Sequence, residues 1–106
     1  MTEPACLWLV VTEDDTPRLV AMTGDRLTFG RDLRSGVVLH DTKVSRLHAE
    51  ITRDEAGQFH LADLASHNGT LVDGRQLVGS LILHGGERLR IGRTAIDVHA
   101  ERPDLP

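Results

Sequence analysis

Aromatic residues are scarce in this sequence: its 106 residues include one tryptophan, two phenylalanines and no tyrosine. Proteins that bind single-stranded nucleic acid stack bases on aromatic rings and draw on more of them than this. Basic residues are also outnumbered by acidic ones, since the net charge is −4, whereas binding a duplex needs a basic face. We therefore expect no nucleic-acid partner.

Cysteine and long apolar runs are missing as well. The single Cys6 excludes an internal disulfide bond and any zinc site with several cysteines, which fits a reducing, cytoplasmic location. No apolar run approaches the ~18 residues that cross a bilayer. The first fifteen residues lack the positive charge that opens a signal peptide, so we expect no membrane association.

Patterns that indicate a metal site or a catalytic centre are also absent. The six histidines (His40, His48, His60, His67, His84 and His99) are scattered without metal-binding spacing. A hydrolase would draw on Ser45, His48 and Asp63, but no nucleophile elbow surrounds Ser45, and Asp63 suits a turn cap better. We expect no enzyme, no metal and no cofactor.

What the sequence does contain is a succession of short β-forming runs separated by turn residues. No apolar pattern with helical period is sustained, and strand alternation is clear in Leu89 and Ile91 against Arg88 and Arg90. We predict strands at residues 6–12, 17–23, 26–30, 36–39, 47–53, 58–64, 70–72, 75–78, 80–83, 87–91 and 94–100. Asp73-Gly74 predicts a two-residue hairpin turn.

These strands predict an all-β fold, a β-sandwich of about eleven short, mostly antiparallel strands with ligand loops at one end. The length is that of one domain, which we expect to span residues 1–106, with a core at about 6–100 and a loose tail at 101–106. Thr12 has an acid three residues later and would be an internal ligand if phosphorylated. We favour a solvated loop there instead.

Three polar clusters fall in predicted turns rather than in strand centres. They are Gly30-Arg31, the run Ser45-Arg46-x-His48, and the run Ser66-x-Asn68-Gly69-Thr70. Loops at one end of a sandwich commonly carry its binding site. Together the clusters offer a guanidinium, hydroxyls, an amide and backbone N–H groups, a set that suits a tetrahedral dianion such as phosphate.

With these clusters in order, the chain resembles the forkhead-associated (FHA) domain, a phosphothreonine-peptide binding module. The resemblance is carried by FGRDLRSGVVLHDTKVSRLHAEI and DLASHNGTLVDGRQL, and it extends from LVAMTGDRLTFGR to ERLRIGRTAIDV. Each motif alone is common, but the three together are specific. The resemblance implies an eleven-stranded β-sandwich that binds a phosphothreonine-containing protein, such as a Ser/Thr kinase or its substrate.

The resemblance also implies roles for individual residues. The phosphate-binding residues would be Arg31 and Ser45, with Arg46 adding charge. The peptide-binding residues would be Asn68 on the main chain, Lys43 near the third residue after the phosphothreonine, and His67. The remaining motif residues, Gly30, His48, Gly69 and Thr70, would hold the loops in place.

Three positions depart from the family pattern. His67 stands where a threonine that donates to phosphate is common, Asp73 where asparagine is common, and Gly36 where aspartate is common. A second interpretation is a scaffold of the same fold that binds partners whether or not they are phosphorylated. It would apply if the pocket were lost, and it ranks second because Arg31, Ser45 and Asn68 are all present.

Overall fold

The computed structural model describes residues 6–105, and all the regular secondary structure in that range is β-strand. The strands are β1 (Leu7–Glu13), β2 (Thr16–Met22), β3 (Arg26–Gly30), β4 (Val37–Val38), β5 (Ala49–Arg53), β6 (Phe59–Asp63), β7 (Thr70–Val72), β8 (Arg75–Gln76), β9 (Ser80–Leu83), β10 (Arg88–Ile91) and β11 (Thr94–His99). The predicted all-β class is confirmed, and each predicted strand end lies within two residues of the observed one. Within the described range there is accordingly no helix that would reach across a bilayer.

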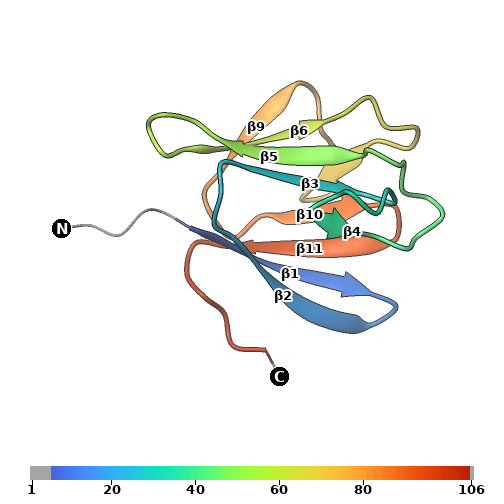
Figure 1. Ribbon diagram of the computed structural model, residues 1–106, viewed down its shortest axis with the longest axis horizontal. Coiled ribbons are helices and arrows are strands. Elements are labelled where there is room, and N and C mark those ends of the chain that lie inside the picture. The colour runs from blue at the N-terminus through green and yellow to red at the C-terminus, as the bar shows by residue number, and fades with distance from the viewer. Residues whose placement is uncertain (1–5, 106) are drawn as a thin grey trace.

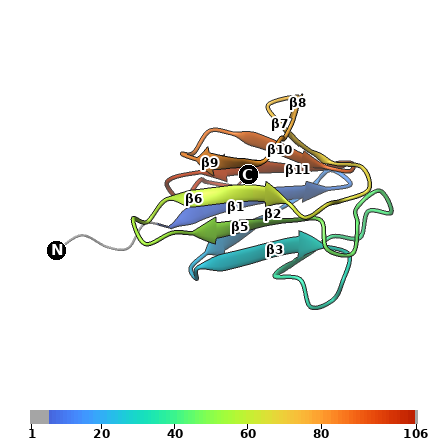
Figure 2. The same ribbon diagram turned by 90° about the horizontal axis from the view of Figure 1, so that it is seen from above.

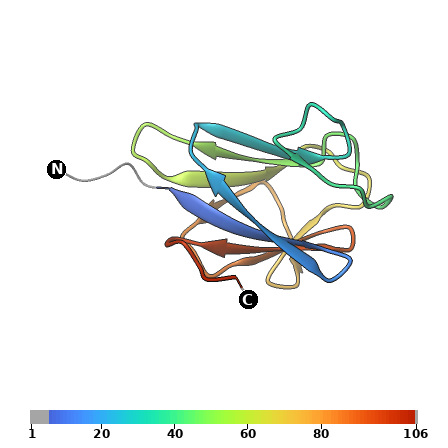
Figure 3. The ribbon, with the colours of Figure 1, turned by 60° about the horizontal axis from the view of Figure 1, so that its bottom comes forward.

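The strands form two sheets that pack face to face (Figures 2 and 3). One sheet has the order β2-β1-β11-β10-β7-β8 and the other β4-β3-β5-β6-β9. Every pairing is antiparallel except the short parallel pair β3–β4, in which Phe29 lies opposite Val37. The mostly antiparallel sandwich predicted from the sequence is therefore confirmed.

Alternation along the strands builds the core between the sheets. Leu89 and Ile91 of β10 are fully buried, while Arg88 and Arg90 on the opposite face of that strand are exposed. Phe29 of β3 is also fully buried and is among the largest side chains in the core. Arg102, in the segment after β11, lies over the ring of Trp8 at 5.5 Å from its centroid.

The hairpin turns follow the chemistry of their residues. Asp73 and Gly74 have φ values of 50° and 83°, as the predicted two-residue turn requires. A second turn of this kind at Asp14 and Asp15, with φ values of 48° and 62°, joins β1 to β2. Thr12 consequently lies inside β1, paired with both β2 and β11, so the expectation of a solvated loop at this residue was wrong.

Antiparallel order brings several loops to the same end of the sandwich, on the right of Figure 1. These are the loops from β3 to β4, from β4 to β5, from β6 to β7 and from β10 to β11. All three polar clusters singled out in the sequence lie in these loops or at the strand ends that bound them.

Candidate functional site

Gly30 allows the first two loops to lie directly against each other. It is the buried last residue of β3, and a Cβ atom at this position would stand 2.0 Å from the carbonyl oxygen of Arg46. Two backbone hydrogen bonds join the two loops at this contact. The Arg31 N–H donates to the Ser45 carbonyl and the Asp32 N–H donates to the Arg46 carbonyl, both at 3.1 Å. Any side chain at Gly30 would separate the loops.

The Arg31 side chain is exposed, and one of its nitrogens is fixed by a hydrogen bond to the neighbouring loop. Its Nε donates to the carbonyl oxygen of Val44, a buried residue of the neighbouring loop. Its two terminal nitrogens donate no hydrogen bond to any group within residues 6–105. A guanidinium oriented in this way has its terminal N–H groups available for two oxygens of an anion.

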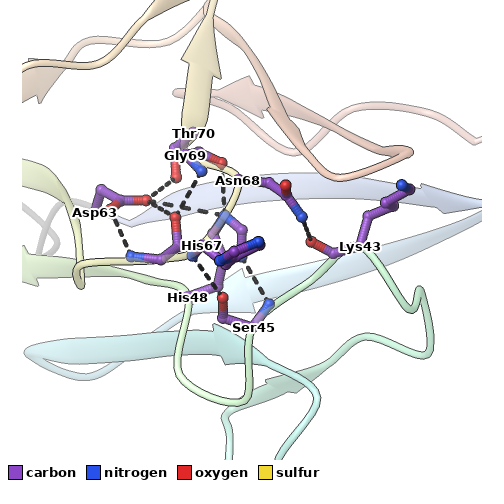
Figure 4. A network of polar contacts seen from close by, with 9 residues as sticks. Lys43, Ser45, His48, Asp63, His67, Asn68, Gly69 and Thr70 are labelled. Carbon is purple, nitrogen blue, oxygen red and sulfur yellow. Dashed lines mark hydrogen bonds and ion pairs between the residues drawn. The ribbon is translucent and has the colours of Figure 1, made fainter.

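His48 joins the β4–β5 loop to the β6–β7 loop (Figure 4). Its side chain is fully buried, at the residue directly before β5. Nδ1 accepts from the Ser45 N–H at 3.0 Å, so Nε2 carries the proton and donates to the Gly69 carbonyl at 2.7 Å. Both ring nitrogens are therefore occupied by backbone groups.

Asp63 closes the β6–β7 loop as a turn cap, the role that its place at a strand end indicated. Its carboxylate accepts from the Ser66 N–H at 2.9 Å, from the Ser66 hydroxyl and from the Thr70 hydroxyl at 2.8 Å. Partial burial alone would raise the pKa of Asp63, but these hydrogen bonds and nearby His48 outweigh it and lower the pKa.

Two further hydrogen bonds connect the same loops at the surface (Figure 4). The His67 N–H donates to the Ser45 hydroxyl oxygen at 2.9 Å, which leaves the hydroxyl proton of Ser45 free to donate to a ligand. The Asn68 side-chain amide donates to the Lys43 carbonyl at 2.8 Å. Ser45, His67 and Asn68 thus stand side by side at the exposed edge of the site.

The remaining predicted residues lie in or beside the same loops. Gly69 has a φ of 80°, and a side chain there would collide with Gln76 of β8. Thr70 is fully buried, with its hydroxyl on Asp63. Arg46 is exposed beside Ser45. The pKa of Asp32 is lowered mainly by hydrogen bonds from Arg34, and the charge of Arg46 adds to the effect. All ten predicted site residues therefore lie in the cluster of loops at one end of the sandwich or at the strand ends beside it.

Residues of β10 and of the β10–β11 turn lie beside the predicted site residues, although no motif in the sequence indicated this. In the sequence Arg90 is only one of the polar residues that alternate along a predicted strand, yet it lines a hollow of about 300 Å³ next to Asn68 and Lys43, together with Arg93. Asp41 was also missed: it accepts backbone N–H bonds from Lys43, at 2.9 Å, and from Arg93. The Asp-x-Lys turn was the available signal for Asp41.

The pKa of Asp41 reflects these bonds. Its partial burial favours the neutral acid, but the two backbone N–H groups and the charges of Arg93 and Lys43 prevail and lower the pKa.

Across residues 6–105, no group of three or more histidine, cysteine, aspartate or glutamate side chains is placed to hold a metal ion. The carboxylates of Asp41 and Asp63 are occupied by donors of the loops, whereas Arg31, Ser45 and Arg46 keep N–H or O–H groups available, which suit an anion.

Most of the strands of the sandwich lie in a segment that matches a known protein family. The model of the FHA domain matches residues 27–92, from β3 to the residue after β10. The chain is 44% identical over 64 residues to the glycogen accumulation regulator GarA of Mycolicibacterium smegmatis, a match covering 60% of this chain and 39% of that protein. It is 34% identical over 101 residues to the FHA domain-containing protein FhaB of Mycobacterium tuberculosis, covering 89% of this chain and 61% of FhaB. The match thus spans less than two thirds of the length of each of these relatives.

Solved structures of FHA domains have the same fold as this chain. A domain from a structural and functional analysis of phosphothreonine-dependent FHA domain interactions superposes with a TM-score of 0.81 and 32% identity, covering 92% of this chain and 99% of that chain. The FHA domain of FhaA, complexed with the intracellular domain of Rv3910, superposes with a TM-score of 0.79 and 33% identity, covering 88% and 99%.

Proposed function

This chain belongs to the FHA domain family, and on that premise we propose that it is a phosphothreonine-dependent protein-interaction module without catalytic activity. The observation that carries the proposal is the convergence of Arg31, Ser45 and Asn68 from three separate loops. The loops are locked together by backbone contacts and by His48, so the site is assembled before a ligand arrives.

The phosphate is bound by Arg31 and Ser45. A phosphothreonine carries about −1.5 to −2 charge at neutral pH, and a guanidinium meets two of its oxygens with charge-assisted hydrogen bonds. The Ser45 hydroxyl adds a donor, and exposed Arg46 adds positive charge beside it. The imidazole of His67, in the position where the family often has a threonine donor, supplies a further N–H to the phosphate, since the backbone N–H of His67 is bonded to Ser45.

The peptide continues from the phosphate toward Asn68 and Lys43. Asn68 binds the main chain just after the phosphothreonine, using the amide groups that its bond to Lys43 leaves available. Lys43 is exposed and favours an acidic residue three positions after the phosphothreonine. The partner is a phosphorylated protein, such as a Ser/Thr kinase or its substrate, in the cytoplasm.

The geometry of His48 supports the absence of catalysis. A hydrolase would need its imidazole to take a proton from the Ser45 hydroxyl. The ring nitrogens instead accept from the Ser45 backbone and donate to Gly69, and the hydroxyl accepts from His67. The carboxylate of Asp63 is occupied in the same way by the β6–β7 loop.

Calorimetry with phosphothreonine peptides tests the proposal. The best peptide from a degenerate library should bind with about micromolar affinity, roughly −8 kcal/mol, and its unphosphorylated form should not bind measurably. Arg31→Ala should weaken binding by about 2–4 kcal/mol, because a charge-assisted partner of the phosphate is lost.

Arg53→Ala is the matched control, since Arg53 lies over Phe59, on the strand end away from these loops, and should leave the affinity unchanged. Binding that is indifferent to phosphorylation and to Arg31 would instead favour the phosphorylation-independent scaffold.

A further inference from the structure

Half of the twelve basic side chains form an ion pair or lie over an aromatic ring within residues 6–105. Four arginines form ion pairs with carboxylates: Arg18, Arg26, Arg34 and Arg88. Two others, Arg53 and Arg102, lie over aromatic rings. The other six have neither kind of partner within residues 6–105: Arg31, Lys43, Arg46, Arg75, Arg90 and Arg93. Three of these six, Lys43, Arg90 and Arg93, line one hollow.

The hollow beside Asn68 has a volume of about 300 Å³ and is lined by Lys43, Asn68, Gly69, Leu71, Arg90, Gly92 and Arg93. No carboxylate is among its lining residues. The carboxylate of Asp41 lies beside Lys43 and Arg93, but its single negative charge offsets only part of the three positive charges around the hollow. The composition of the hollow therefore favours an anionic ligand group.

The positions of these cations are determined by the fold. Arg90 lies on the outward face of β10, and its Nε donates to the Gly92 carbonyl at 3.3 Å. The backbone N–H groups of Lys43 and Arg93 both bind the carboxylate of Asp41, which places the two residues next to each other. Arg93 also lines a neighbouring acidic hollow with Glu13, so it contributes at the border between the two.

We propose that this hollow is a second anion subsite, which takes an acidic or phosphorylated side chain lying after the phosphothreonine in the same peptide. The inference rests on the proposed function, because the hollow shares Asn68 with the phosphopeptide site. It assigns Arg90 and Arg93, and not Lys43 alone, as determinants of which peptides are chosen.

A phosphate should occupy the subsite more tightly than a carboxylate. The phosphate carries up to two charges and three acceptor oxygens, whereas a carboxylate carries one charge and two oxygens. Two arginines and a lysine can donate to all three phosphate oxygens. The preferred ligands are therefore segments with two phosphorylated residues, followed by segments with one phosphothreonine and a downstream acid.

A peptide series tests the subsite. Each peptide carries one phosphothreonine and has phosphoserine, glutamate or alanine at one of the second to fifth positions after it. At one spacing we expect phosphoserine to bind about tenfold or more tightly than alanine, with glutamate between them. Arg90→Gln and Arg93→Gln should each remove most of that gain and leave the affinity for the alanine peptide unchanged.

Arg88→Gln is the matched control for long-range charge. Arg88 lies on the same strand and face as Arg90, but it is paired with Asp97 at 3.2 Å. This variant should keep the full gain from phosphoserine. Phosphoserine binding no better than alanine at every spacing, or a gain lost equally in Arg88→Gln, would overturn the subsite while the phosphothreonine function stands. If the wild type binds no singly phosphorylated peptide, the proposed function fails, and the subsite with it.

Discussion

Gly30 and His48 are both buried, and both act on the site through the residues beside them. Gly30 lets the loop after Arg31 touch the loop that carries Ser45, and His48 joins that second loop to Gly69. The phosphate-binding geometry therefore depends on two residues that a ligand need not touch. Each can be tested by a single substitution.

We expect Gly30→Ala to fold and to bind phosphopeptide poorly. The new Cβ would stand 2.0 Å from the Arg46 carbonyl oxygen, so the two loops must move apart. Overpacking of this kind costs about 1–3 kcal/mol of stability. Urea denaturation measures the loss and calorimetry the affinity. Gly24→Ala, where no atom lies within 4 Å of the added Cβ, is the control and should change neither.

His48→Ala should destabilise the protein by about 2–4 kcal/mol, because a fully buried ring is lost and the Ser45 N–H and Gly69 carbonyl lose their partner. His60→Ala is the comparison, since His60 is partly exposed and bonds only to Asp54 at the surface. Equal losses of unfolding free energy in the two variants would mean that His48 does not hold the loops.

At the scale of elements, two-residue turns join strands with a residue in the left-handed region at each central position. The β7–β8 turn uses Asp73 and Gly74, whereas the β1–β2 turn uses Asp14 and Asp15. Glycine adopts a positive φ without steric cost, and aspartate adopts it at some cost. The β1–β2 turn, with two aspartates at positive φ, therefore carries a larger conformational cost than the β7–β8 turn, which has one aspartate and one glycine.

Gly74→Ala isolates the conformational cost of such a turn. No atom lies within 4 Å of the added Cβ, so the φ of 83° is the only source of strain. We expect a loss of about 1–2 kcal/mol in the free energy of unfolding. Thermal or urea denaturation measures it against Gly24→Ala, which has the same open surroundings without a left-handed φ. A neutral Gly74→Ala would contradict the turn assignment.

At the scale of the whole molecule, stability should depend on acid pH. The Arg34 side chain lowers the pKa of Asp32 to about 2, and hydrogen bonds from His60 and the backbone lower the pKa of Asp54. For Asp63 and Asp41, hydrogen bonds and nearby cations likewise lower the pKa despite partial burial. A carboxyl whose folded pKa is depressed stabilises the fold above its unfolded pKa, near 3.9, and this contribution is lost as pH falls toward the folded value.

We therefore expect the free energy of unfolding to decrease below about pH 4. Asp63→Asn should remove part of this dependence and should also cost about 1.5–3 kcal/mol at neutral pH, since three donors lose a charged acceptor. Urea denaturation at neutral pH and at about pH 3 measures both effects. Parallel pH profiles for wild type and Asp63→Asn would remove Asp63 from the acid response.

Some features could be predicted from the sequence because they are local. The alternation of Leu89 and Ile91 with two arginines, and the Asp73-Gly74 turn, depend on neighbours in the chain. The β1–β2 turn was not identified as a two-residue turn, because Asp14-Asp15 lacks the glycine that usually marks one. The hydrogen bond from His48 to the Gly69 carbonyl could not be predicted either, because the two residues meet only when the β4–β5 and β6–β7 loops come together.

The sequence by itself determined the strands, the all-β class and the three polar motifs, since each depends on side-chain period or turn chemistry within a few residues. Only the tertiary structure decided that Gly30 would touch Arg46, and that Arg90 and Arg93 would share a hollow with Lys43. These contacts join residues far apart in the chain. They arise when strand pairing brings loop ends together, and strand order and register are set by packing of the whole sandwich.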